Sequence, residues 1–144
     1  MQPDAAAMAS IFQQLGSISA VLGGFAFASA GALLAATEQR GGSAASFAVG
    51  SAVLAAVCFI VSSMAWTLSS VRATGAASLA QTLPASTFVM HGAMSLVFEI
   101  GALALLASLG ISGWVRSRRL GWFTTIVAGL AAIAGFVVVV QFIG

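Results

Sequence analysis

Four long apolar runs constrain this chain more than any other feature of its sequence. They cover Leu15–Ala36, Phe47–Ser69, Phe88–Ile111 and Gly121–Ile143. Each is about 20 residues or longer, the length that an α-helix rising about 1.5 Å per residue needs to cross a hydrocarbon core of ~30 Å. The runs lack the two-residue alternation of a membrane strand, so we expect helices. The sequence predicts an all-α fold with a single domain, an antiparallel bundle of four transmembrane helices.

Charged residues are too few to cover a water-soluble protein of 144 residues. Only 6% of the residues are charged and 60% are hydrophobic, whereas a soluble domain carries about 25% charged residues. The net charge of +2 comes from five arginines against three acids. Such a sparse set does not form the clustered basic surface that nucleic acid requires. We therefore expect lipid as the main partner and no nucleic acid.

The arginines predict how the chain is oriented in the membrane. The first and third loops lie on one side, and the N-terminus, the second loop and the C-terminus lie on the other. The first side holds Arg40, Arg116, Arg118 and Arg119, and the second holds only Arg72. Because cytoplasmic loops are enriched in Lys and Arg, both termini are predicted on the non-cytoplasmic side, in a bacterial inner membrane.

Small residues recur every four positions in two of the runs, a pattern typical of close helix packing in lipid. The first run carries Gly16, Ala20, Gly24, Ala28 and Ala32, and the fourth carries Gly121, Thr125 and Gly129. Two interpretations are open. The ladders either pack the four helices against each other or dock onto another subunit, which is a different protein or a second copy of this chain.

Glu99 is the one acidic residue well inside an apolar run, eleven residues after Phe88. A charged group at membrane depth is costly and needs a reason. Three interpretations are open: a neutral carboxyl group hydrogen-bonded to Ser62 or Ser63, a proton or cation site, and a contact with a partner subunit.

His91 is the only histidine, and methionines lie near it in the sequence or on the same side of the membrane. These are Met90, Met94 and, on the second run, Met64. Imidazole and thioether groups suit copper, and the same imidazole can ligate haem or a pigment. The third interpretation is a hydrogen-bonded histidine near the membrane surface. No cofactor is predicted firmly, and bound lipids are expected.

Patterns of catalysis are missing from the sequence. It contains no GxSxG, HExxH, CxxC or P-loop motif. Its single cysteine, Cys58, excludes an internal disulfide and a multi-cysteine metal site. The sequence therefore predicts a non-catalytic membrane subunit or scaffold that packs through small-residue helix faces. The alternatives are an oligomeric ion channel or small transporter that uses Glu99, and a metal-, haem- or pigment-associated subunit that uses His91.

Overall fold

The computed structural model describes residues 4–37, 42–79 and 81–143. The side chains at positions 37, 115, 116, 134–136 and 138–143 lie outside the description, as does the whole of Arg40.

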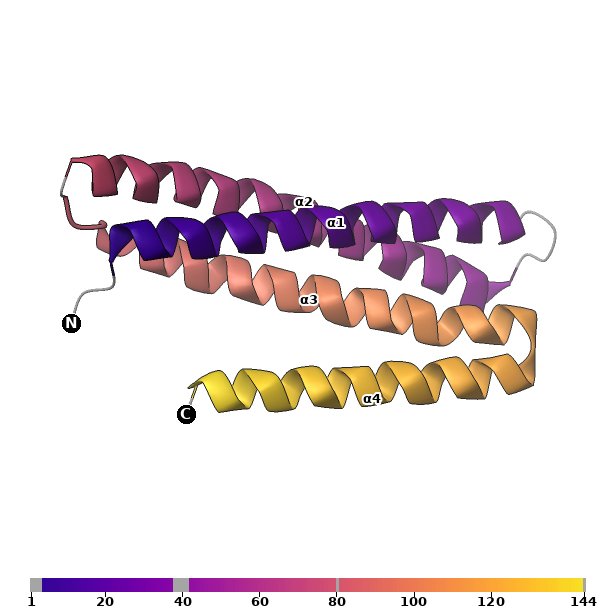
Figure 1. Ribbon diagram of the computed structural model, residues 1–144. Helices are drawn as coiled ribbons and strands as arrows, with labels where there is room; N and C mark the ends of the chain where they lie inside the picture. The colour runs from indigo at the N-terminus through magenta and orange to yellow at the C-terminus, as the bar shows by residue number, and fades with distance from the viewer. Residues whose placement is uncertain (1–3, 38–41, 80, 144) are drawn as a thin grey trace.

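The described chain is helical throughout, in four helices that follow one another with short connections (Figure 1). They are α1 (Ala5–Thr37), α2 (Ser43–Ser78), α3 (Ala85–Arg116) and α4 (Arg118–Ile143). Among the described residues, α1, α2 and α3 are long and apolar enough to cross a membrane. The chain is therefore an all-helical protein of the membrane type. The fourth crossing stays a prediction.

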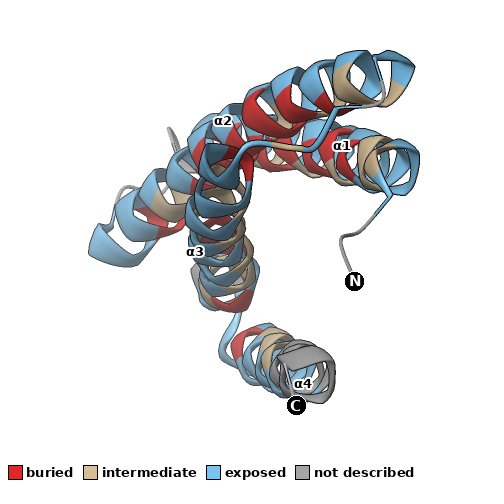
Figure 2. Ribbon diagram, turned by 90° about the vertical axis from the view of Figure 1, so that its left-hand side faces the viewer, coloured by how far each residue is buried: buried red, intermediate tan, exposed pale blue. Residues whose placement is uncertain are grey.

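The four helices form an open row and not a closed bundle (Figures 1 and 2). Neighbours in sequence are neighbours in space: α2 packs between α1 and α3, and α4 packs on α3. Within the described residues the backbone of α1 approaches that of α3 at few points, and α4 contacts neither α1 nor α2. The predicted four-helix bundle is thus not confirmed. The physical reason is that lipid tails are as apolar as leucine side chains, so no hydrophobic force drives α4 to close the row.

The helices are longer than the apolar runs that predicted them. The 36 residues of α2 extend about 54 Å, well beyond a hydrocarbon core of ~30 Å. The stretch between the second and third apolar runs is mostly helical, because α2 continues to Ser78 and α3 begins directly after Pro84. At the start of α1, Asp4 caps the helix: its carboxylate accepts a hydrogen bond from the amide of Ala6 at 3.1 Å.

The seam between α1 and α2 follows a seven-residue repeat. Its α1 side is made of buried residues spaced four and three apart, namely Phe12, Gly16, Ser19, Gly23, Ala26 and Ala30. Each pair of steps spans seven residues, about 3.5 per step, a repeat that is typical of helices that cross at a small angle. Small residues let the backbones approach: a Cβ on Gly23 would lie 3.3 Å from the Cβ of Phe59.

Between α2 and α3 the contact is closest at Gly101. A Cβ at this position would lie 2.9 Å from the Cβ of Cys58 and 3.4 Å from the ring of Phe59. Phe59 is fully buried and meets the ring of Phe98 edge-on, with centroids 5.2 Å apart. Cys58 is a free, buried cysteine that serves here as a packing residue.

Helices α3 and α4 are joined by a turn in which only Ser117 is non-helical. The Ser117 hydroxyl accepts a hydrogen bond from the amide of Leu120 at 3.2 Å, as an N-cap does. Glycine is required on both sides of the turn. A Cβ on Gly113 would overlap the hydroxyl of Thr124, and one on Gly121 would lie within 2.8 Å of three ring atoms of Trp114.

Candidate functional site

His91 lies at the outer end of α3, the end near the N-terminus of the chain, in contact with both α1 and α2. The indole Nε1–H of Trp66 donates a hydrogen bond to His91 Nδ1 at 3.2 Å. The ring of Phe12 lies 5.4 Å from the imidazole, centroid to centroid. Because an indole can only donate, Nδ1 carries no proton, and neutral imidazole carries its proton on Nε2. The structure thus gives His91 a hydrogen bond of the kind that the third interpretation expects.

The methionines near His91 do not converge on it as a set. Met94 is half-buried against the cluster that contains Phe12 and Trp66. Met90 is half-buried one position before His91, whereas Met64 is 64% exposed. Met64 precedes Trp66 by two residues and therefore lies on the opposite face of α2. In the described part of the chain, no three His, Cys, Asp or Glu side chains are grouped to hold a metal ion.

Glu99 is exposed on the face of α3 that points away from α2. It lies two residues from Gly101, which faces α2, and two residues turn a helix by about 200°. The hydrogen bond to Ser62 or Ser63, one of the three open interpretations, is not formed in this structure. Ser62 donates instead to the carbonyl of Met94 at 3.5 Å, and Ser63 to that of Gly16 at 2.9 Å. No described residue forms a hydrogen bond or ion pair with the Glu99 carboxylate.

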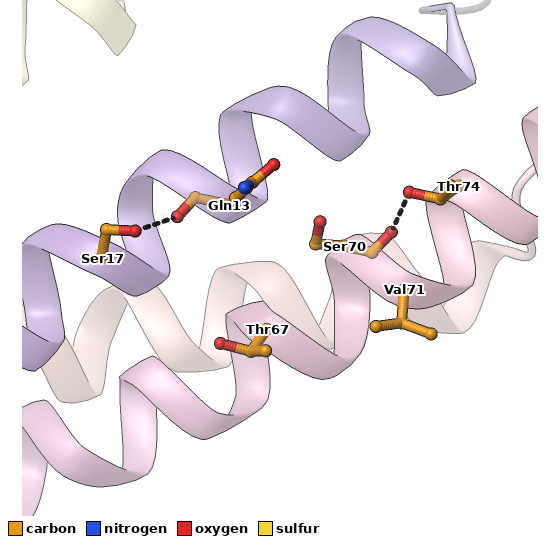
Figure 3. A pocket seen from close by; sticks show the side chains of 6 residues that line it. All are labelled: Gln13, Ser17, Thr67, Ser70, Val71 and Thr74. Carbon is orange, nitrogen blue, oxygen red and sulfur yellow. Dashed lines mark hydrogen bonds between the residues drawn. The ribbon is translucent and has the colours of Figure 1, made fainter.

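An open hollow of about 470 Å³ lies between the outer parts of α1 and α2 (Figure 3). It is lined by Gln13, Ser17, Thr67, Ser70, Val71 and Thr74. Each of its four hydroxyl groups donates its proton to a backbone carbonyl, for example Ser70 to Ala9 at 3.0 Å and Thr67 to Ser63 at 2.8 Å. The hydroxyls can therefore only accept further hydrogen bonds, and the Gln13 amide is left as the side-chain donor. This lining can hold water or a polar headgroup but offers no nucleophile and base.

The small-residue ladder of α1 leaves the seam after its first member. Gly16 is buried against Thr67, whereas Ala20, Gly24, Ala28 and Ala32 are exposed. Four residues turn a helix by about 400°, so each step adds about 40° and the last member has rotated about 160° from the first. Within the chain only Gly16 packs. Docking of the other four on another subunit stays a prediction.

The ladder of α4 divides in the same way. Gly121 is buried against Trp114, and the Thr125 hydroxyl accepts a hydrogen bond from the indole of Trp114 at 3.0 Å. Gly129 is exposed and has no atom within 4 Å of a Cβ placed on it. The contact between α3 and α4 is therefore concentrated near the turn.

The basic residues of the third loop lie at the turn between α3 and α4. Arg118 and Arg119 are exposed in the first turn of α4. Arg116 ends α3, with its side chain outside the described residues, and Arg72 is exposed on α2.

The sequence does not predict which serines form a hydrogen bond with a neighbouring helix. Besides Ser62, Ser63 and Ser70, the Ser108 hydroxyl donates to the carbonyl of Ala48 at 2.8 Å. In lipid such bonds add to helix association. The one available signal was a serine inside an apolar run, and it does not tell whether the hydroxyl bonds its own helix or the next. Two buried hydroxyls, Ser19 and Thr87, have no partner among the described residues.

No protein-family model, no curated protein and no solved structure matches the chain.

Proposed function

We propose that this chain is a non-catalytic membrane subunit that packs, through uncovered helix faces, into a larger membrane complex or a homo-oligomer. The observation that carries the proposal is the open row of helices, in which α4 packs on α3 and, among the described residues, on no other helix. One face of α1 carries the small residues Ala20, Gly24 and Ala28 in exposed positions. Small residues on a lipid-facing surface give close helix contact only when a second helix covers them.

In this proposal α4 is the fourth crossing of a bacterial inner membrane. The arginines at Arg40 and around the α3–α4 turn lie in the cytoplasm, because positively charged loops are retained there. Both termini then lie on the non-cytoplasmic side, together with the hollow between α1 and α2.

The test is the mass of the protein purified in a mild detergent. Native mass spectrometry is expected to show a homo-oligomer or a complex with fixed stoichiometry. Gly24→Ile fills a position where nothing lies within 4 Å of an added Cβ, so it should disrupt assembly and leave the helix content unchanged. Gly50→Ile is the matched control, since Gly50 is also exposed with open space around it but lies on α2. A monomeric wild-type protein would contradict the proposal.

Glu99 favours a second candidate, an oligomeric ion channel or small transporter. Its carboxylate is exposed within an apolar helix and has no partner among the described residues. A carboxylate at this depth in other membrane proteins marks proton and ion pathways. Glu99→Gln should then lower proton or cation flux into liposomes, and an unchanged flux removes this candidate.

A further inference from the structure

Glu99 belongs to a seam of α3 that is covered over only half its length. Positions 92, 96, 99, 103, 106, 110 and 113 are spaced four and three apart, which places them on one face of the helix. At the inner end, near the α3–α4 turn, α4 covers this face: a Cβ on Gly110 would lie 3.7 Å from the Cβ of Ala128. Figure 1 shows α4 separating from α3 with distance from their common turn.

The outer half of the seam is uncovered. Gly92, Leu96, Glu99 and Leu103 are all exposed, and nothing lies within 4 Å of a Cβ placed on Gly92. Leu96 and Leu103 expose 62% and 60% of their surface. A small residue, two leucines and one carboxylate at seam positions form a complete surface for one further helix. We name these four residues the outer α3 seam.

No described residue brings a positive charge to Glu99. Gly101 packs against Cys58, so Arg72 stands fourteen residues along α2 from this level, about 21 Å of helix rise. The arginines of the α3–α4 turn lie at the opposite end of α3. His91 is eight residues away, about 12 Å along the helix, and its Nδ1 is bonded to Trp66.

Closure of α4 onto the outer α3 seam would not supply a cation either, since α4 has no charged residue after Arg119. A second copy of the chain would bring only another Glu99 to the same depth. A counter-charge for an ionised Glu99 would therefore come from a different chain.

We propose that the outer α3 seam docks a transmembrane helix of another protein, and that this helix carries a Lys or Arg near mid-membrane that pairs with Glu99. The inference rests on the proposed role as a membrane subunit and names the chemistry of its partner. Charged groups inside membranes pair with one another. A carboxylate at one seam position makes the surface selective, because an apolar helix leaves the charge unpaired.

The experiment uses the full chain in phosphatidylcholine vesicles, with a fluorescent donor at its C-terminus. The probes are acceptor-labelled Leu/Ala transmembrane peptides that differ only at the central residue, which is Lys, Leu, Gln or Glu. Energy transfer should show that the Lys peptide binds about tenfold more tightly than the Leu peptide. Glu99→Gln should remove this difference, and Glu99→Lys should shift the preference to the Glu peptide.

Leu103→Gln is the matched control. It places an amide one turn away on the same seam and should keep the preference for Lys. Equal binding of the Lys and Leu peptides overturns the inference, and so does a Lys preference that survives Glu99→Gln. Self-association of labelled wild-type chains that is lost in Glu99→Gln also overturns it, because Glu99 then pairs between copies.

These results separate the inference from the proposed function. An assembly that persists in mild detergent without any Lys preference removes the role of Glu99 and keeps the subunit. A monomer that binds none of the peptides removes both. Glu99 makes no contact that folding of the described residues needs, so its variants should keep the helix content of the wild type by circular dichroism.

Discussion

The hydrogen bond between Trp66 and His91 joins α2 and α3 in their outer halves. Trp66 is 2% exposed, so its indole N–H has no water to bond if the imidazole is removed. Leaving a buried donor unpaired costs about 1–3 kcal/mol. Removing the acceptor is therefore expected to cost more free energy than the hydrogen bond itself contributes.

Changes at His91 test this account. His91→Leu should lower the free energy of unfolding by about 1–3 kcal/mol, because the indole loses its acceptor. His91→Asn should restore part of that loss, since an amide oxygen can occupy the position of Nδ1. Both are measured by equilibrium unfolding in detergent. Equal stability of His91→Leu and the wild type would contradict the structural role of the bond.

Single residues were predictable to different degrees. The position of Gly16 at a helix contact followed from its small size, but the rest of its ladder turned out to be exposed. A four-residue step and the observed steps of four and three are almost the same over one turn and diverge over four turns. The partner of Glu99 could not be inferred either, because the sequence does not reveal which face of α3 meets α2.

At the scale of helices, contact depends on how closely two backbones approach. If Gly101 of α3 carried a Cβ atom, this atom would lie 2.9 Å from the Cβ of Cys58 on α2, which is shorter than any ordinary carbon contact. The neighbouring atom is the Cβ of Cys58 and cannot rotate away. The two helices must therefore separate to accept even one methyl group.

Gly101→Ala should accordingly destabilise the protein by about 1–3 kcal/mol, the usual cost of overpacking a well-packed contact. Gly50→Ala, at an exposed helix position with open space, should be neutral or stabilise by up to about 1 kcal/mol. Cys58→Gly in the Gly101→Ala background should recover part of the loss, whereas Cys58→Ala should not. Thermal unfolding of the four variants compares them. A Gly101→Ala protein as stable as Gly50→Ala would show that the contact is looser than described.

The apolar runs predict the number and type of the helices, but they predict the ends of the helices less well. Arg72 lies in the second loop of the sequence prediction, yet α2 continues through it and through Gly75. An isolated glycine costs a helix only about 1 kcal/mol, which the preceding turns of α2 can absorb. Pro84 was a better signal, because the residue before a helix suits its fixed φ angle.

The molecule as a whole is held together by sequential pairs of helices. Both clusters of buried residues lie within α1, α2 and α3 and the short connection between α2 and α3. Helix α4 adds its contacts near the turn and none to α1 or α2 among the described residues. Sequence patterns give the number of helices but not closure, since closure depends on interactions between faces that lipid can replace.

A chain that ends after Ser117 should therefore keep α1, α2 and α3 folded. We expect the remaining helices to retain their helicity by circular dichroism and a cooperative thermal transition in detergent. Removal of residues 1–41 is the control. It deletes α1 and uncovers Phe59 and Trp66, so it should abolish that transition. Loss of cooperative unfolding in the chain that lacks α4 would contradict the open row.

The orientation of the whole chain in the membrane can be tested with a C-terminal fusion and by replacing arginines. A C-terminal alkaline phosphatase fusion, which is active only outside the cytoplasm, should be active in the wild type. Replacing Arg116, Arg118 and Arg119 with Gln leaves one arginine on each side, Arg40 and Arg72, and so removes the excess on the first side. The fusion should then lose activity in a measurable fraction of molecules. An inactive wild-type fusion would place the C-terminus in the cytoplasm.

The one-residue connection at Ser117 also governs how α4 can move. Because Ser117 alone separates α3 from α4, neither helix can slide along the other. Helix α4 can change its position only by rotating about Ser117. Such a swing displaces its far end most and leaves the glycine contacts beside the turn intact. The proposed partner helix then has room beside Glu99 while the contacts beside the turn stay packed.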